Sequence, residues 1–202
     1  PAGADESEVG FEEVLTNYIT QVTARGIADL ALTGDTGGGD PLDGFITKLY
    51  AAAGVINVSG PAPTTANALT QLFAVYENMS DETLQSSARP VIFVGLDWLR
   101  KAAIQAYNDN RFAYNFQIDE RNGFTLPSTN VRVQGFEALN GTNKLLAGAA
   151  DYLLVGTDIE DDFSTINMWY SQDNRAIRIS VRMRLGVAIA FVNKFVKYTV
   201  TP

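Results

Sequence analysis

The sequence contains no cysteine and no histidine. Without thiols there are no disulfides, no thiolate nucleophiles and no zinc sites of the usual kind, and without imidazole there is no histidine-dependent catalytic triad. Basic residues are also scarce, with 15 Lys and Arg against 23 Asp and Glu and a formal net charge of -8. A sequence-independent grip on nucleic acid needs phosphate-neutralising cations, so the composition argues against a dedicated nucleic-acid binder.

Long apolar runs are missing as well. None approaches the roughly 18 to 20 residues of a membrane span, and no basic segment precedes an apolar one as in a signal peptide, so no membrane partner is expected. With 202 residues, 46% of them hydrophobic, the chain can form one large domain or two small ones that share elements. It begins at Pro1 without a methionine, and we expect that a piece has been removed from its start.

The segment from Phe11 to Thr33 is the longest with a single helical apolar face. Its 23 residues predict a rod of about 35 Å that ends at Gly34, a residue suited to a left-handed cap. Gly26 interrupts the segment where alanine would favour the helix, so we expect another backbone to approach closely there. The apolar positions are Phe11, Val14, Leu15, Tyr18, Ile19, Val22, Ile27 and Leu30.

The stretch Gly34 to Phe45, GDTGGGDPLDGF, follows the helix and predicts a loop. A phosphate-binding loop would need a lysine and a Ser or Thr directly after the last glycine, and a dinucleotide fingerprint would need a preceding strand. Here a helix precedes the triple glycine and Asp40-Pro41 follows it. A turn between domains is therefore the favoured interpretation.

The middle region alternates helical and strand patterns. Helices are predicted at Ala66 to Met79, Asp81 to Gln85 and from Leu96 onward, and the apolar run Val91 to Val94 predicts a buried strand. Phe45 to Tyr50 fits a short strand or a turn of helix. Further short strands are expected at Tyr114 to Ile118, Gly123 to Leu126, Asn130 to Gln134, Lys144 to Gly148 and Tyr152 to Val155.

Ala176 to Phe191, AIRISVRMRLGVAIAF, alternates almost strictly and predicts a long half-buried strand or a hairpin broken at Gly186. Its apolar face should cover the helix, with Ile179, Val181 and Met183 over Tyr18 and Val22. Its other face carries Arg178, Arg182 and Arg184, for which a solvated sheet surface is favoured over an interaction surface.

The densest acidic cluster is GTDIEDD, with Asp158, Glu160, Asp161 and Asp162. It resembles a calcium loop but lacks the central glycine and the terminal glutamate of an EF-hand, so an acidic solvent-facing turn is favoured. A metal-dependent hydrolase that uses Asp158 to Asp162 remains the rival hypothesis from another functional class. We assign no catalytic, cofactor-binding or metal residue.

Four stretches in one order resemble the HK97-type major capsid protein of tailed phages. They are ADLALTGDTGGG before PLDGF, PVIFVGLDWLRKAAIQAYNDNRF, LNGTNKLLAGAADYLLVGTD and MWYSQDNRAIRISVRMRLGVAIAFVNKFVKY. The resemblance covers residues 11 to 200 and implies an α+β fold of two parts. Residues 1-44 and 164-192 would form a P-domain of a long spine helix packed on a β-sheet, and residues 45-163 with 193-202 a mixed α/β axial A-domain.

The same resemblance implies a structural protein, not an enzyme. Copies would self-assemble as hexamers and pentamers into an icosahedral phage or prophage capsid that encloses DNA without sequence-specific binding. The subunit would need no cofactor and would reside in the virion, and in the bacterial cytoplasm before assembly, where scaffold or protease partners are compatible with it. Encapsulin nanocompartments share the fold and are the nearest alternative.

The chain also departs from the family pattern. Full-length members carry an N-terminal arm and an E-loop ahead of the spine helix, and both clasp neighbouring subunits, whereas this chain starts just before the helix. The cross-linking lysine of some members lies on that loop, so no cross-link residue can be carried over. We therefore expect a core fragment that is folded and mostly monomeric in dilute solution and forms no closed shells.

Overall fold

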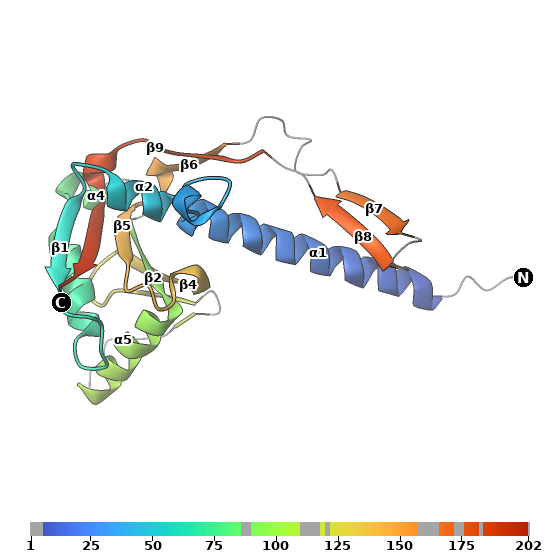
Figure 1. Ribbon diagram of the computed structural model, residues 1–202. Coiled ribbons are helices and arrows are strands. Elements are labelled where there is room, and N and C mark those ends of the chain that lie inside the picture. The colour runs from blue at the N-terminus through green and yellow to red at the C-terminus, as the bar shows by residue number, and fades with distance from the viewer. Residues whose placement is uncertain are drawn as a thin grey trace, which may run out of the picture.

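The computed structural model describes residues 6–85, 90–109, 118–119, 122–156, 166–171, 176–181 and 184–201. Its dominant element is helix α1 (Glu6–Thr33), whose 28 residues leave a compact body at one end and extend away from it (Figure 1). The predicted helix is confirmed and begins five residues earlier than expected. In the described part of the chain, no helix is both long and apolar enough to cross a membrane.

The body is built on a six-stranded mixed sheet in the order β1-β10-β5-β2-β4-β3. The pairs β1–β10 and β2–β4 are parallel, and the other three pairs are antiparallel. The strands are β1 (Ile56–Gly60), β2 (Pro90–Gly95), β3 (Gly123–Thr125), β4 (Arg132–Phe136), β5 (Leu145–Ala149) and β10 (Val196–Val200). The helices are α2 (Phe45–Ala51), α3 (Ala68–Glu77), α4 (Asp81–Gln85) and α5 (Leu96–Asn108).

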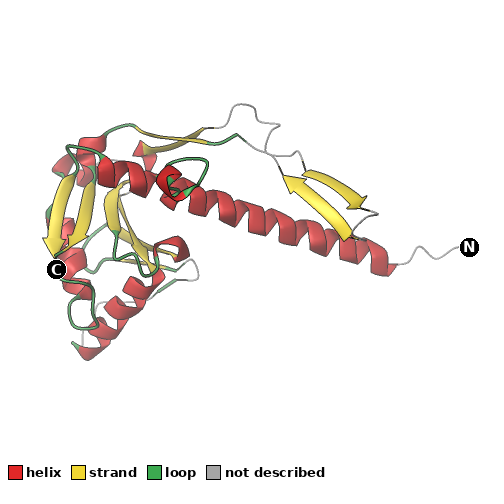
Figure 2. Cartoon of the chain, viewed as in Figure 1, coloured by secondary structure: helices red, strands yellow, loops and turns green. Residues whose placement is uncertain are grey.

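Both faces of this sheet are covered, which accounts for the continuous apolar run in β2. Ile92 packs with the side chains of α3 and α5 in one cluster, around the fully buried Trp98. Its neighbour Phe93 points to the opposite face and packs with Leu49 of α2 and with Phe195. The predicted buried strand feeding a helix is confirmed, and Figure 2 shows the helices arranged around the sheet.

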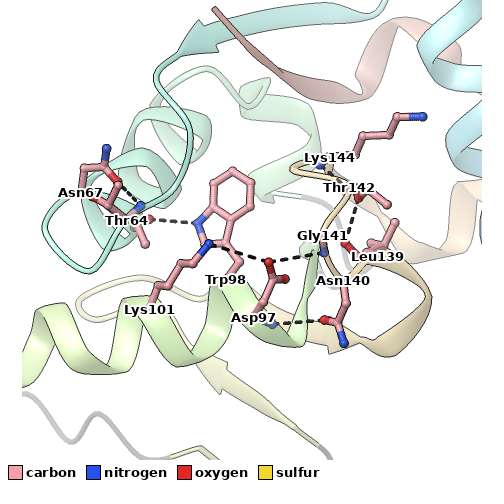
Figure 3. Close-up of polar contacts among 11 residues, drawn as sticks. Thr64, Asn67, Asp97, Trp98, Lys101, Leu139, Asn140, Gly141, Thr142 and Lys144 are labelled. Carbon is pink, nitrogen blue, oxygen red and sulfur yellow. Dashed lines mark hydrogen bonds and ion pairs between the residues drawn. The ribbon is translucent and has the colours of Figure 1, made fainter. Parts of the chain in front are cut away.

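The start of α5 is anchored by a turn that lies far away in sequence (Figure 3). The Asp97 backbone N–H donates to Asn140 Oδ1 at 3.1 Å, and Asp97 Oδ2 accepts from the Gly141 N–H at 3.4 Å. Asn140 thus satisfies one of the orphan donors at the helix N-terminus. Gly141 has a φ of 71°, which glycine adopts without strain.

Two smaller sheets complete the fold. Strand β6 (Leu153–Gly156) pairs with β9 (Gly186–Ile189), and β7 (Ile166–Ser171) pairs with β8 (Ala176–Val181). The predicted long strand is thus divided into β8 and β9, and β9 begins at the expected break, Gly186. The β7–β8 hairpin lies away from the body, as does the N-terminal half of α1 (Figure 1).

The expected close backbone approach at Gly26 is wrong. A Cβ built on Gly26 would meet no atom within 4 Å, because that side of α1 is open. The close approach occurs where α1 turns into α2: Gly44 N–H donates to Gly34 O at 2.8 Å, and a Cβ on Gly44 would stand 2.7 Å from Gly34 N. Glycines are therefore required at the crossing and not within the helix.

The remaining expectations have different outcomes. Phe45 to Tyr50, expected to be a short strand or a turn of helix, is helical. Strands β1, β7 and β10 were not predicted. Of the strand expected at Tyr114 to Ile118, residues 114–117 lie outside the described residues. The division into P-domain and A-domain stays a prediction.

Candidate assembly surface

The apolar face of α1 is wider than the part of it that the chain covers. Residues four apart lie along one stripe of a helix, so the face divides into two adjacent stripes. One stripe, formed by Leu15, Ile19, Thr23 and Ile27, is half-buried. The other is exposed and is called the open stripe below. It consists of Val14, Tyr18 and Val22, with exposed fractions of 68%, 65% and 52%.

The prediction that the long strand covers Tyr18 and Val22 is therefore wrong. The principal contacts of α1 with the body are made to α2 and to the turn Glu137–Leu139, and its buried residues Ala31 and Leu32 lie in the last turn. An ion pair between Arg25 and Glu137 fixes the same end. A rod of about 42 Å held at one end carries most of its apolar face beyond the body. Met183, the third residue of the predicted cover, lies outside the described residues.

A polar stripe borders the open stripe on the side away from the half-buried residues. It is formed by Glu13, Asn17 and Gln21, all exposed. The first turns of α1 also contain Glu6, Glu8 and Glu12, and a helix N-terminus favours such anions. The open stripe is thus apolar along its length and is flanked by the Glu13 carboxylate near its N-terminal end.

The β7–β8 hairpin presents an aromatic and a cationic side chain together. The strand register places Trp169 directly opposite Arg178, and both side chains are exposed, Trp169 to 46%. Residues directly opposite in an antiparallel pair lie on the same face of the sheet. Arg178 is exposed, and the choice between a solvated surface and an interaction surface for the arginine face stays a prediction. The sequence reasoning missed Trp169, although the alternation in INMWYS could have placed it on that face.

A third apolar surface lies on the β6–β9 pair. A groove of about 570 Å³ runs over both strands and is lined by Leu154, Val155, Gly186 and their neighbours. Leu154 and Val155 are half-exposed, and the facing glycines Gly156 and Gly186 leave the backbone uncovered there. A two-stranded sheet alone is marginally stable in water, so this ribbon depends on the body packed beneath Val187.

Tyr50 of α2 forms hydrogen bonds that hold α2 to the central sheet of the body. Its hydroxyl donates to the Tyr198 carbonyl at 2.6 Å and accepts the Leu145 N–H at 3.1 Å, which joins α2 to β10 and β5. Burial raises the pKa of Tyr50 to about 12, because the phenolate would lose its hydration. The body is therefore held by a neutral tyrosine.

We expect the free energy of unfolding to fall as the pH rises from about 10 to 12. In the unfolded chain Tyr50 ionises near its ordinary pKa of about 10, whereas in the folded chain it keeps its proton up to about 12. The stabilisation is complete below pH 10 and lost above the folded pKa. Urea titrations at pH 9, 10 and 11 measure this, and the decline should be shallower in Tyr50→Phe. Equal declines in the two proteins would contradict it.

Chemistry based on carboxylates finds no support in the described residues. Asp158, Glu160, Asp161 and Asp162 lie outside them, so the interpretation of that cluster stays a prediction. Among the residues that are described, no group of three or more Asp or Glu side chains is placed to hold a metal ion. What the described chain offers is a set of exposed apolar and charged surfaces.

No protein-family model matches the sequence, and no curated protein matches it. Solved structures do. The chain is similar to a structure of Gordonia phage Cozz, with a TM-score of 0.61, 14% identity, and 96% of this chain and 64% of that chain covered. It is similar to the capsid of an empty GTA particle, with a TM-score of 0.54, 15% identity, and coverage of 95% and 66%.

A third similar structure is the satellite phage P4 procapsid including size determination (Sid) protein, with a TM-score of 0.54 and 11% identity. The match covers 98% of this chain and 65% of the procapsid chain. The chain thus spans just under two thirds of the length of each of these structures. Their likeness extends over nearly the whole chain, and the predicted α+β fold with a long helix and a mixed sheet is confirmed.

Proposed function

We propose that this chain, which has the fold of phage capsid proteins, is a structural subunit of an icosahedral phage or prophage capsid and not an enzyme. The observation that carries the proposal is the open stripe of α1. Soluble monomers rarely expose contiguous large apolar side chains, and such surfaces typically mark sites of protein–protein contact. The fold likeness supplies the kind of assembly in which that contact would occur.

The proposed mechanism is assembly through repeated contacts. A rod that projects from a body offers its neighbours a surface distinct from the body itself, which suits the heterologous contacts that close into rings. We propose that hexamers and pentamers form in this way, with residues 1-44 and 164-192 as the P-domain and residues 45-163 with 193-202 as the A-domain. The β6–β9 groove and the hairpin provide further contact area.

The remaining parts of the proposal concern the contents and the setting of the shell. With a net charge of -8 the subunit has little general attraction for phosphate, so DNA would be retained by enclosure and not by sequence-specific binding. The shell would belong to the virion and would be built in the bacterial cytoplasm, with scaffold or protease partners. The similar structures are capsids of phages and of GTA, which favours this function over an encapsulin or a hydrolase.

Electron microscopy of the expressed protein tests the proposal. We expect closed particles of uniform diameter from the gene product that includes the upstream arm and E-loop implied by the resemblance, and mostly monomers from the 202-residue chain in dilute solution. The arm and loop would add buried area to contacts that rigid cores leave small. A longer product that stays monomeric would contradict the capsid function. Closed shells from the 202-residue chain would contradict only the need for the upstream segments.

A further inference from the structure

We propose that the open stripe of α1 is covered by the β7–β8 hairpin of a second copy, with Arg178 of that copy set against Glu13. This inference rests on the proposed function, because it names the partner of the assembly surface. The contact would be heterologous, with the helix of each copy held by the hairpin of the next.

The shape of α1 requires an external partner. Val14, Tyr18 and Val22 are spaced four residues apart and form a ridge about 12 Å long. The half-buried stripe beside the ridge occupies the side of the helix that the chain itself partly covers, and the exposed polar stripe with Glu13 occupies the other side. A partner that reaches the ridge therefore also meets Glu13.

The distribution of charge selects the orientation. Residues 5 to 13 contain only acidic charges, whereas the strands β7 and β8 contain a single charged residue, the basic Arg178. The acids are Asp5, Glu6, Glu8, Glu12 and Glu13. Two helix starts brought together would repel each other, and so would two hairpins. A helix start against a hairpin is the arrangement in which unlike charges meet.

The hairpin has the chemistry that this ridge needs. Trp169 and Arg178 share its exposed face, and tryptophan and arginine are enriched among the residues that contribute most to protein interfaces. The indole would cover apolar surface at the ridge while the guanidinium pairs with the Glu13 carboxylate. In the described part of the structure, neither Glu13 nor Arg178 forms an ion pair within its own chain, so both charges are available.

A mixing experiment separates a contact between copies from one within a chain. Glu13→Arg and Arg178→Glu are made in separate chains, and association is followed by sedimentation velocity over a concentration series in 0.1 M NaCl. Either variant alone places like charges at every contact, and we expect about tenfold weaker association than in the parent. In an equimolar mixture each helix finds a complementary hairpin on the other variant. We expect the mixture to recover association to within about threefold of the parent.

Matched controls change the same charges elsewhere. Glu77→Arg on α3 and Arg100→Glu on α5 alter exposed residues, so each alone should associate like the parent, and their mixture should gain nothing. The parent's association should also weaken at 1 M NaCl, because the screening length falls from about 10 to 3 Å.

Three results would overturn the inference. They are single variants that associate as the parent does, a mixture no stronger than its components, and a parent chain that stays monomeric up to millimolar concentration. None of these decides the proposed function, which is judged by whether the longer product forms particles in the electron microscope. Particles that form regardless of the charge reversals would keep the capsid function and reject this pairing.

Discussion

Tyr18→Asp is expected to leave the chain folded and to prevent its assembly into particles. Tyr18 lies at the centre of the open stripe and is 65% exposed, and exposed surface substitutions usually change the free energy of unfolding by no more than about 0.5 kcal/mol. At the proposed contact between copies, the same aspartate would be desolvated without a partner, which is costly and would be repeated at every contact of the proposed shell. Thermal unfolding by circular dichroism and negative-stain images of the longer product measure the two effects.

Asn17→Asp provides the matched control, because it adds the same charge one residue away on the exposed polar stripe. We expect this variant to fold and to assemble. Particles from Tyr18→Asp would show that the open stripe does not take part in the assembly contact. A large loss of stability in Tyr18→Asp would show instead that the stripe is packed within its own chain.

The sequence predicts those elements whose stability is decided by local pattern. The 3.6-residue period from Phe11 to Thr33 is sufficient for α1, and the apolar run Val91 to Val94 with the amphipathic segment after it is sufficient for β2 and α5. Strands β1 and β10 were not predicted because their pairing joins Ile56 to Val196, two short segments far apart in the chain. Neither segment is distinctive without its partner.

The candidate surface could be predicted only in part. Periodicity shows how wide the apolar face of α1 is, and alternation shows that the strand at Ala176 has an apolar face. It was assumed that two such faces in one chain would cover each other. That assumption fails at Tyr18 and Val22, because a helix anchored at Ala31 and Leu32 projects past the body. Sequence pattern predicts that an apolar face exists. Which segment packs against that face is decided by tertiary and quaternary geometry.

Glycine content shows the same limit. Five glycines between Gly34 and Phe45 predict a loop, and Gly26 was expected to mark a close approach of two backbones, but the sequence did not show where two backbones meet. The structure places the contact at Gly34 and Gly44, and the Thr47 hydroxyl also donates to the Gly34 carbonyl at 2.7 Å. The attachment of α1 to the body therefore depends on direct contact between the backbones at Gly34 and Gly44.

Gly44→Ala is expected to destabilise the chain by about 2 to 4 kcal/mol. The added Cβ would stand 2.7 Å from Gly34 N and 2.8 Å from Leu32 O, and these are backbone atoms that cannot rotate away as a side chain would. Relief requires the two segments to separate, which breaks the Gly44 N–H to Gly34 O hydrogen bond and loosens α1 from α2. In a protein of this size each kcal/mol corresponds to about 2 to 4 °C in Tm, so a fall of roughly 5 to 15 °C is expected in thermal unfolding.

Gly26→Ala makes the same chemical change in open space and should act in the opposite direction. With no atom within 4 Å of the new methyl, the helix propensity of alanine should raise the stability by about 1 kcal/mol, or roughly 2 to 4 °C in Tm. The pair thus compares one methyl at a backbone crossing with one methyl on a free helix surface. A Gly44→Ala variant as stable as the parent would mean that the crossing can open without cost. In that case the contact between Gly34 and Gly44 would not hold α1 rigidly on the body.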